Sequence, residues 1–132
     1  MILDTNALLW FYEGSTRLGL KAKASIIAAL EEDAAGYSAI SVWELAVLVR
    51  KGRYRLEESP LSWRARLVRD GFKEHPINGV IAAKSQTLEG LHDDPADRFI
   101  VATSMDTNQI LCTADKKLLN WLDKSYVIDA SI

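Results

Sequence analysis

The chain has 132 residues, of which 48% are hydrophobic and 26% are charged, and its net charge is −2. This length is typical of a single domain, residues 1–132, that buries roughly two-thirds of the surface exposed by the unfolded chain. The apolar runs are shorter than the ~18 residues that a membrane span needs, and no signal peptide is recognisable, so we expect a cytoplasmic protein without a membrane anchor. The single Cys112 excludes a disulfide framework within one chain.

Short apolar runs alternate with stretches of helical periodicity along the chain. In chain order, we predict a strand at 1–3, helices at 5–12 and 16–33, a strand at 37–41, helices at 42–51 and 61–70, a strand at 72–77, helices at 79–88 and 96–107, a strand at 109–113, a helix at 114–123 and a strand at 126–128. This alternation favours an α/β fold with a mostly parallel sheet, in which ligands bind beyond the carboxyl ends of the strands.

Several helix starts are marked by capping residues. Ser41 precedes an apolar helix that we expect to be buried, and Glu44 follows three positions later, which is the spacing of a capping box. Asn78 is placed to cap the next helix but one. Asp94 and Pro95 have the residue types that the N-cap and first helical position prefer.

Four acidic residues are predicted at strand ends or in first helical turns: Asp4, Glu44, Asp97 and Asp115. Each has a structural alternative. Asp4 is suited to a turn or cap, Asp115 to an N-cap, and Asp97 to the positive end of its helix. Glu44 is explained by a capping box, but its neighbours are almost all apolar, and a buried carboxylate without a partner is unfavourable.

Taken together, the four acids favour a metal site. Carboxylates gathered on one edge of a sheet repel one another, and a divalent cation removes that repulsion. Oxygen ligands suit Mg²⁺ or Mn²⁺, whereas His75 and His92 are isolated, so no zinc cluster is predicted. Glycine-rich nucleotide-binding motifs are absent. An acidic metal site points to phosphodiester hydrolysis.

Positive charge is concentrated in residues 50–73. This segment holds eight lysines and arginines against three acidic residues, a balance of +5 that leaves −7 for the rest of the chain. Such a segment is either a footprint for a polyanion or an ordinary solvated face. As RNA-binding residues we name its first four cations: Arg50, Lys51, Arg53 and Arg55.

Four stretches of the chain resemble the PIN-domain ribonucleases, and more closely their VapC type, the toxins of VapBC toxin–antitoxin pairs. They are MILDTNALLW, SAISVWELAVLVRKGRY, LHDDPADRFIVATS and LCTADKKL, in the order of the family and across essentially the whole chain. The resemblance implies an α/β/α sandwich with a mostly parallel central sheet and a Mg²⁺- or Mn²⁺-dependent endoribonuclease acting on single-stranded RNA. It also implies a cognate antitoxin and a toxin homodimer.

The resemblance further implies roles for individual residues. The catalytic, metal-binding acids are Asp4, Glu44, Asp97 and Asp115, and the supporting polar groups are Thr5, Asn6 and Thr113. Asp94 then remains a helix cap, and Asp93 an exposed loop residue. The aromatic residues Trp10, Phe11, Tyr12 and Trp63 either line an antitoxin groove or belong to the core.

Two other functions stay open. One is a PIN domain that binds RNA or protein without cutting, although the complete set of four acids argues against it. The other is a phosphatase of the haloacid dehalogenase kind, which also begins with an aspartate after a strand. That family needs a second aspartate two positions later, where this chain has Asn6.

Overall fold

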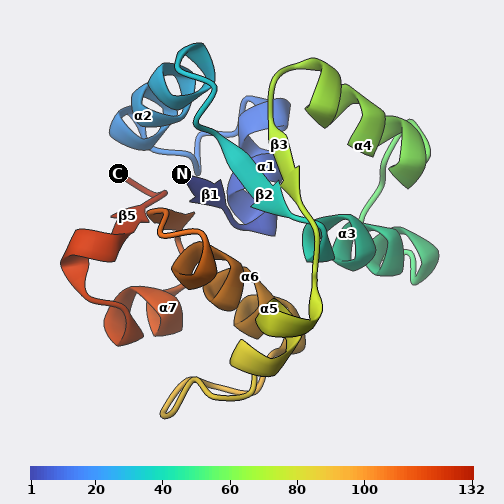
Figure 1. Cartoon of the computed structure of the whole chain (residues 1–132). Coiled ribbons are helices and arrows are strands. Elements are labelled where there is room, and N and C mark those ends of the chain that lie inside the picture. The colour runs from blue at the N-terminus through green and yellow to red at the C-terminus, as the bar shows by residue number, and fades with distance from the viewer.

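Five parallel strands form one central sheet in the computed structural model, which describes residues 1–132 (Figure 1). The strands are β1 (Ile2–Leu3), β2 (Gly36–Ser38), β3 (Lys73–His75), β4 (Leu111–Thr113) and β5 (Val127–Asp129). Their spatial order is β3-β2-β1-β4-β5, and every neighbouring pair is parallel. The chain builds outward from β1 in one direction and later in the other. The strand order reverses between β1 and β4. Sheets of this kind bind ligands at the carboxyl ends of the strands at such a switch point.

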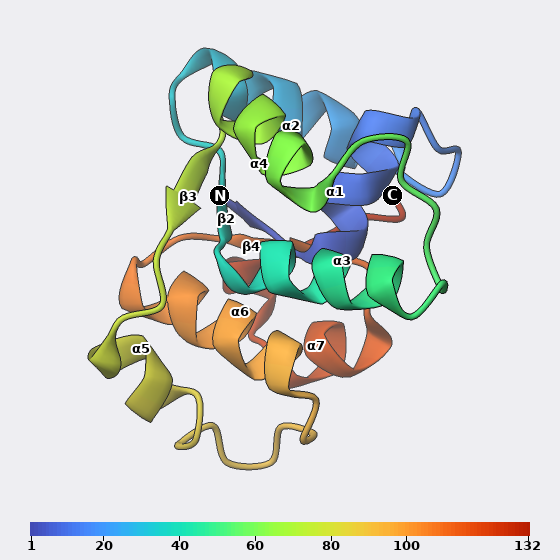
Figure 2. The same ribbon diagram turned by 90° about the vertical axis from the view of Figure 1, so that its right-hand side faces the viewer.

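Helices cover both faces of the sheet and give three layers (Figure 2). One face carries α1 (Thr5–Glu13), α2 (Leu20–Glu31) and α4 (Pro60–Arg69), and the other carries α5 (Gly79–Lys84), α6 (Pro95–Asp106) and α7 (Lys116–Trp121). The helix α3 (Ile40–Arg50) follows β2 and contacts α1, α4 and α6. A short 3₁₀ turn, η1 (Lys124–Tyr126), leads into β5. The predicted α/β/α sandwich is confirmed, with a sheet that is parallel throughout.

Successive residues of β1 point to opposite faces of the sheet. Leu3 packs with Tyr37 and Cys112 in the core beneath α1, α2 and α4, whereas Ile2 packs with Leu111 in the core beneath α6 and α7. All five side chains are fully buried. Complete burial of a leucine or isoleucine stabilises the fold by about 1.5–3 kcal/mol, so both faces of the sheet hold β1 firmly. The residue that follows is Asp4.

The structure corrects the predicted boundary before α3. The strand β2 ends at Ser38, and the helix begins at Ile40, two residues earlier than predicted. The N-cap is Ala39, which has no side-chain cap, and no capping box joins Ser41 to Glu44. The reason is local, because the Ser38 hydroxyl accepts the backbone N–H of Ile40 and turns the chain at once.

The other differences concern lengths. The helix predicted at 16–33 begins only at Leu20, because the Ser15 hydroxyl accepts the backbone N–H of Arg17 and closes a turn first. The helix predicted at 79–88 ends at Lys84, the first four strands are shorter than predicted, and β5 has the predicted length but begins one residue later. None of the seven helices has the length and apolarity that crossing a membrane requires.

Candidate active site

Asp4 lies at the carboxyl end of β1 and is the N-cap of α1. One carboxylate oxygen accepts the backbone N–H of Ala7 at 2.8 Å, and the other accepts the hydroxyl of Thr113. The side chain is only 5% exposed. Burial raises the pKa of Asp4 to about 6 against the effect of these two donors, and the charges of Asp97 and Glu44 raise it further. The capping alternative for Asp4 is therefore correct, yet the cap is a buried acid with other acids nearby.

Three of the four predicted acids line one small pocket beyond β1, with a volume of about 80 Å³. Asp4 comes from the end of β1, Glu44 from the second turn of α3, and Asp97 from the first turn of α6. The complete lining is Asp4, Thr5, Asn6, Glu44, Leu48 and Asp97. The structure thus brings together acids from three elements that are far apart in the sequence.

Larger hollows exist, but none of them gathers acids from several elements in this way. The hollow of about 420 Å³ beside α7 is lined by Trp121 and Tyr126 and contains one acid, Asp123. The hollow of about 570 Å³ between α1 and α4 is lined by three glutamates, but Arg55 and Arg66 stand among them. The chemistry of the lining, rather than its size, therefore identifies the candidate site.

The pKa values of the other two acids in the pocket are also raised. Burial raises the pKa of Glu44, and the charges of Asp97 and Asp94 raise it further. Burial likewise raises the pKa of Asp97, with Asp94 and Asp115 adding to the shift and His92 opposing it. Burial and the neighbouring negative charges therefore both make ionisation of these acids less favourable. A bound cation would offset both effects.

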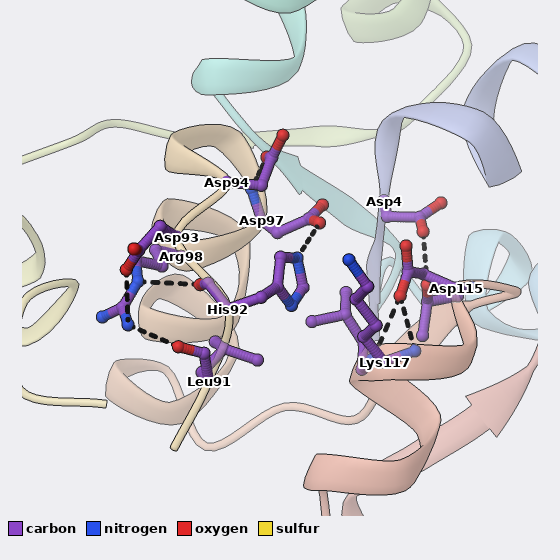
Figure 3. A network of polar contacts seen from close by, with 11 residues as sticks. Asp4, Leu91, His92, Asp93, Asp94, Asp97, Arg98, Asp115 and Lys117 are labelled. Carbon is purple, nitrogen blue, oxygen red and sulfur yellow. Dashed lines mark hydrogen bonds and ion pairs between the residues drawn. The ribbon is translucent and has the colours of Figure 1, made fainter. Parts of the chain in front are cut away.

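Asp97 has a partner that the sequence did not indicate. Its Oδ2 lies 2.7 Å from Nε2 of His92, as Figure 3 shows. The prediction that His92 is an isolated loop residue is therefore wrong. The loop before α6 folds back over the first turn of the helix and brings the imidazole against an acid five positions later. The only signal in the sequence is a histidine placed directly before Asp93 and Asp94.

Asp115 is the N-cap of α7, as its structural alternative predicted. Its Oδ1 accepts the backbone N–H groups of Lys117 at 2.8 Å and Leu118 at 3.1 Å. It does not line the 80 Å³ pocket. Its own backbone N–H donates to the hydroxyl of Thr113 at 3.0 Å, and that hydroxyl donates to the Asp4 carboxylate, so one threonine contacts the backbone of Asp115 and the side chain of Asp4. In Figure 3 the Lys117 side chain extends from α7 toward the space beside Asp115. A catalytic role for Asp115 stays a prediction.

The supporting polar residues take three different positions. Thr113 is fully buried against Asp4. Thr5 is 4% exposed, and its hydroxyl donates to that of Ser41 at 2.9 Å, which ties α1 to α3 beside the pocket. Asn6 is exposed at the rim of the pocket.

Residues at the start of α6 behave as predicted. Asp94 caps the helix by accepting the backbone N–H of Asp97 at 2.9 Å, with Pro95 in the first turn. Asp93 is an exposed loop residue. The helix face that carries Asp97 continues into the core through Ile100, which is 1% exposed. The acid therefore sits where a core-facing helix surface reaches the pocket.

The donor set suits a hard divalent cation in kind, because the pocket offers carboxylate, hydroxyl and amide oxygens and no thiolate. As the side chains lie, no three His, Cys, Asp or Glu groups are close enough to hold one ion between them. Mg²⁺ keeps several of its waters and takes only one or two carboxylates directly. Acids spaced around a small pocket therefore fit Mg²⁺ better than a metal that demands a closed protein cage.

The first cations of the basic segment are exposed and form no ion pair: Arg50, Lys51, Arg53 and Arg55. They lie at and beyond the end of α3, the helix that carries Glu44. The later arginines of the segment are paired, in the couples Arg64–Glu74, Arg66–Glu58 and Arg69–Asp70. Among the arginines of the segment, only those of the first group form no ion pair.

The aromatic residues mostly belong to the core. Trp63 is 1% exposed, and Trp10, Phe11 and Tyr12 are half-buried, with Phe11 packed edge-on against Phe72. They also border two surface hollows, Trp10 and Phe11 one of about 370 Å³, and Tyr12 and Trp63 the one of about 570 Å³, so a groove for an antitoxin stays a prediction.

By contrast, α3 is less buried than predicted. Only one side of the helix faces the core, through Leu45, while Trp43 is 53% exposed on the other side.

Comparisons with known proteins agree with this geometry. The family model for the PIN domain matches residues 1–121. The chain is 32% identical over 119 residues to ribonuclease VapC22 of Mycobacterium tuberculosis, a match that covers 89% of this chain and 88% of that protein. A toxin–antitoxin complex from Klebsiella pneumoniae has the same fold, with a TM-score of 0.62 and 21% identity over 98% of this chain and 96% of that chain. FitAcB from Neisseria gonorrhoeae shares it with a TM-score of 0.62 and 20% identity over 91% of each chain. The chain therefore belongs to the PIN-domain family.

Proposed function

We propose that this protein is an endoribonuclease that cleaves single-stranded RNA with Mg²⁺ or Mn²⁺, and that it is the toxin of a type II pair inhibited by a cognate antitoxin. The observation that carries the proposal is the pocket that Asp4, Glu44 and Asp97 line together in a chain similar to ribonuclease VapC22. The raised pKa values of these acids support a cation between them.

The residues have distinct parts in the proposed reaction. When bound, a divalent ion supplies the Lewis acidity that phosphodiester hydrolysis needs. Asp4, Glu44 and Asp97, which line the pocket, would hold it, and Asp115 would join them from the start of α7. The Thr113 hydroxyl orients the Asp4 carboxylate. The exposed cations beyond α3, beginning with Arg50, would hold the phosphates that flank the scissile bond.

The toxin role draws on the comparisons. One structure with this fold is a toxin–antitoxin complex, and ribonuclease VapC22 belongs to the type that the sequence resembles. An antitoxin partner follows from that likeness. A homodimer, which the resemblance implies, and a cytoplasmic location complete the proposal.

Incubation with total cellular RNA tests the activity. Wild-type protein is supplied with Mg²⁺, Mn²⁺ or EDTA, Asp4→Asn is run in parallel, and the ends of the fragments are mapped. We expect cleavage at defined sites with either metal, none in EDTA and none with the variant. RNA that is bound but left intact with both metals would make the protein a binding module. Equal cleavage by Asp4→Asn would refute the assignment of the site.

Induced expression in a bacterial host tests the toxin role separately. Wild-type protein should arrest growth, whereas Asp4→Asn at the same protein level should not. Growth unaffected by an enzyme that is active in vitro would separate the nuclease from any toxin role.

A further inference from the structure

The guanidinium of Arg98 is folded under the loop that precedes α6. Its side chain is 12% exposed and donates to three backbone carbonyls, those of Ser85 at 3.0 Å, Leu91 at 2.6 Å and His92 at 2.9 Å. The one carboxylate near it, that of Asp93, lies 3.6 Å away on a fully exposed side chain. Arg98 therefore fixes the path of residues 85–92 through their carbonyl groups rather than by pairing with an acid.

That path delivers the His92 ring to Asp97. The two side chains are 19% and 21% exposed, and their contact of 2.7 Å joins Nε2 to Oδ2. An ionised carboxylate only accepts hydrogen bonds, so Nε2 carries the proton that it donates. Figure 3 shows the Asp97 carboxylate between the imidazole and the side of the pocket that Asp4 occupies. No other hydrogen bond reaches this carboxylate, so Oδ1 has no partner, and the residue lines the pocket.

The second nitrogen of the ring is unfavourably placed. Nδ1 of His92 is the one buried side-chain polar atom in the chain that has no hydrogen-bond partner. Leaving such an atom unpaired in the interior opposes folding. A phenylalanine would fill similar space without that penalty, so packing alone does not account for an imidazole here. Its contact with Asp97 does.

We propose that His92 is a positioning residue: held by Arg98, it occupies Oδ2 of Asp97 and so presents Oδ1 to the cation. The inference rests on the proposed function, because it takes Asp97 as a ligand of that cation. In other metal sites, a residue that orients a metal ligand by hydrogen bonding changes metal affinity by about 10- to 100-fold. The Arg98 side chain donates no hydrogen bond to Asp97 and does not line the pocket, so it acts through His92.

Three substitutions of His92 separate positioning from packing. His92→Gln places an amide nitrogen near the position of Nε2, His92→Asn carries the same amide on a shorter side chain, and His92→Phe keeps the ring without a donor. Mn²⁺ binding is measured by calorimetry on RNA-free protein, and cleavage by single-turnover kinetics. We expect His92→Phe and His92→Asn to bind Mn²⁺ at least about tenfold more weakly, and His92→Gln to stay within about threefold of wild type.

Stability gives a second readout, which the loss of a packing role would lower. Without metal, His92→Phe should unfold close to the wild-type temperature, because the penalty of the unpaired Nδ1 disappears together with the hydrogen bond from Nε2 to Asp97. Loss of Mn²⁺ affinity at unchanged or raised stability supports the inference. A His92→Phe protein that binds Mn²⁺ as wild type does overturns it.

Arg98→Lys tests the relay. A lysine cannot reach three carbonyls at once, so Mn²⁺ affinity should fall, and it should fall no further when Arg98→Lys is added to His92→Phe. Additive losses would overturn the action through His92. If wild type binds Mn²⁺ and cuts RNA while His92→Phe equals it, only this inference fails. If wild type neither binds Mn²⁺ nor cuts, the proposed function fails, and the inference fails with it.

Discussion

The hydroxyl of Thr113, at the end of β4, donates a hydrogen bond to the carboxylate of Asp4, at the end of β1, across 109 positions of sequence. Both side chains are buried. The same hydroxyl oxygen accepts the backbone N–H of Asp115, so it also secures the turn into α7. One side chain therefore ties the two central strands together at the switch point of the sheet and orients the acid that begins α1.

Thr113→Val, which replaces the hydroxyl by a methyl group of similar size, should weaken the fold. The donor from Thr113 lowers the pKa of Asp4, so without it the buried carboxylate loses a partner and its pKa rises further. We expect the free energy of unfolding at pH 7.5 to fall by about 1–3 kcal/mol, measured by urea titration in EDTA. Thr113→Ser, which keeps the hydroxyl, should stay near wild type. Equal stability of the valine and serine variants would show that the hydrogen bond contributes nothing.

Asp4→Asn should stabilise the metal-free protein at neutral pH. The pKa of Asp4 is about 6 in the fold against 3.8 for the free side chain, so the folded state binds more protons between these values. Wild-type stability therefore decreases as pH rises through that window, by up to roughly 3 kcal/mol. Asparagine keeps an oxygen for the backbone N–H of Ala7 and does not ionise, so it avoids the cost of a buried charge.

Urea titrations from pH 4 to pH 8 in EDTA check this dependence. The Asp4→Asn variant should be the more stable protein at pH 7.5, and the two should converge toward pH 4. Asp4→Ala serves as the control, because it lacks the N-cap and should lose about 0.5–2 kcal/mol relative to asparagine. An Asp4→Asn protein that is less stable than wild type at pH 7.5 would contradict the raised pKa.

Asp97→Asn and Glu44→Gln should each abolish most RNA cleavage while the fold is retained. Each removes one charge from the pocket. We expect single-turnover rates to fall by more than about 100-fold, which exceeds the loss caused by removing a residue that only hydrogen-bonds a metal ligand. The matched control is Asp93→Asn, the same change on an exposed neighbouring residue. Circular dichroism and Mn²⁺ calorimetry accompany the rates. A rate equal to that of the control would remove the substituted acid from the site.

A test of Asp115 must distinguish its role as the N-cap of α7 from a role in catalysis. Asp115→Asn retains an oxygen for the backbone N–H groups of Lys117 and Leu118, whereas Asp115→Ala loses the cap and about 1 kcal/mol. If the carboxylate takes part in catalysis, asparagine should reduce cleavage without changing the melting temperature. Full activity of Asp115→Asn would leave this residue as a cap alone.

The triple variant Arg50→Gln, Arg53→Gln and Arg55→Gln should bind RNA more weakly, and most clearly at low salt. Each lost phosphate contact reduces the slope of log K against log salt by about 0.7 on a single strand, so the slope should fall by up to about 2. The control replaces Arg64, Arg66 and Arg69, whose charges are already paired with acids. Filter binding with a catalytically inactive background measures both. An unchanged slope would make the segment a solvated face.

The parts of the fold that the sequence predicted well depend on neighbouring residues. The caps at Asn78, Asp94 and Asp115 form as predicted, because a capping oxygen bonds a backbone N–H only two or three positions away. The strand–helix alternation is local in the same sense. It placed Asp4 at a strand end and Asp97 in a first turn, and the parallel sheet then brought both to one edge.

The parts that failed depend on contacts between distant or competing groups. The helix α3 starts early because the Ser38 hydroxyl competes for a backbone N–H that the capping box would have left free. The pairing of His92 with Asp97 depends on a loop whose course is set by carbonyl contacts with Arg98, and no pattern of side chains encodes carbonyl positions. The exposure of Trp43 depends on which helices flank α3, and its apolar neighbours gave no sign of it.

The alternation along β1 has a consequence for how this protein tolerates change. Ile2 enters one core, Leu3 the other, and Asp4 is the next residue, in a strand of two residues paired on both sides. A shift by a single position would exchange the two faces and turn the acid away from its neighbours. Insertions and deletions should therefore be tolerated least in β1, the shortest strand of the sheet, because the number of its residues determines where the Asp4 carboxylate points.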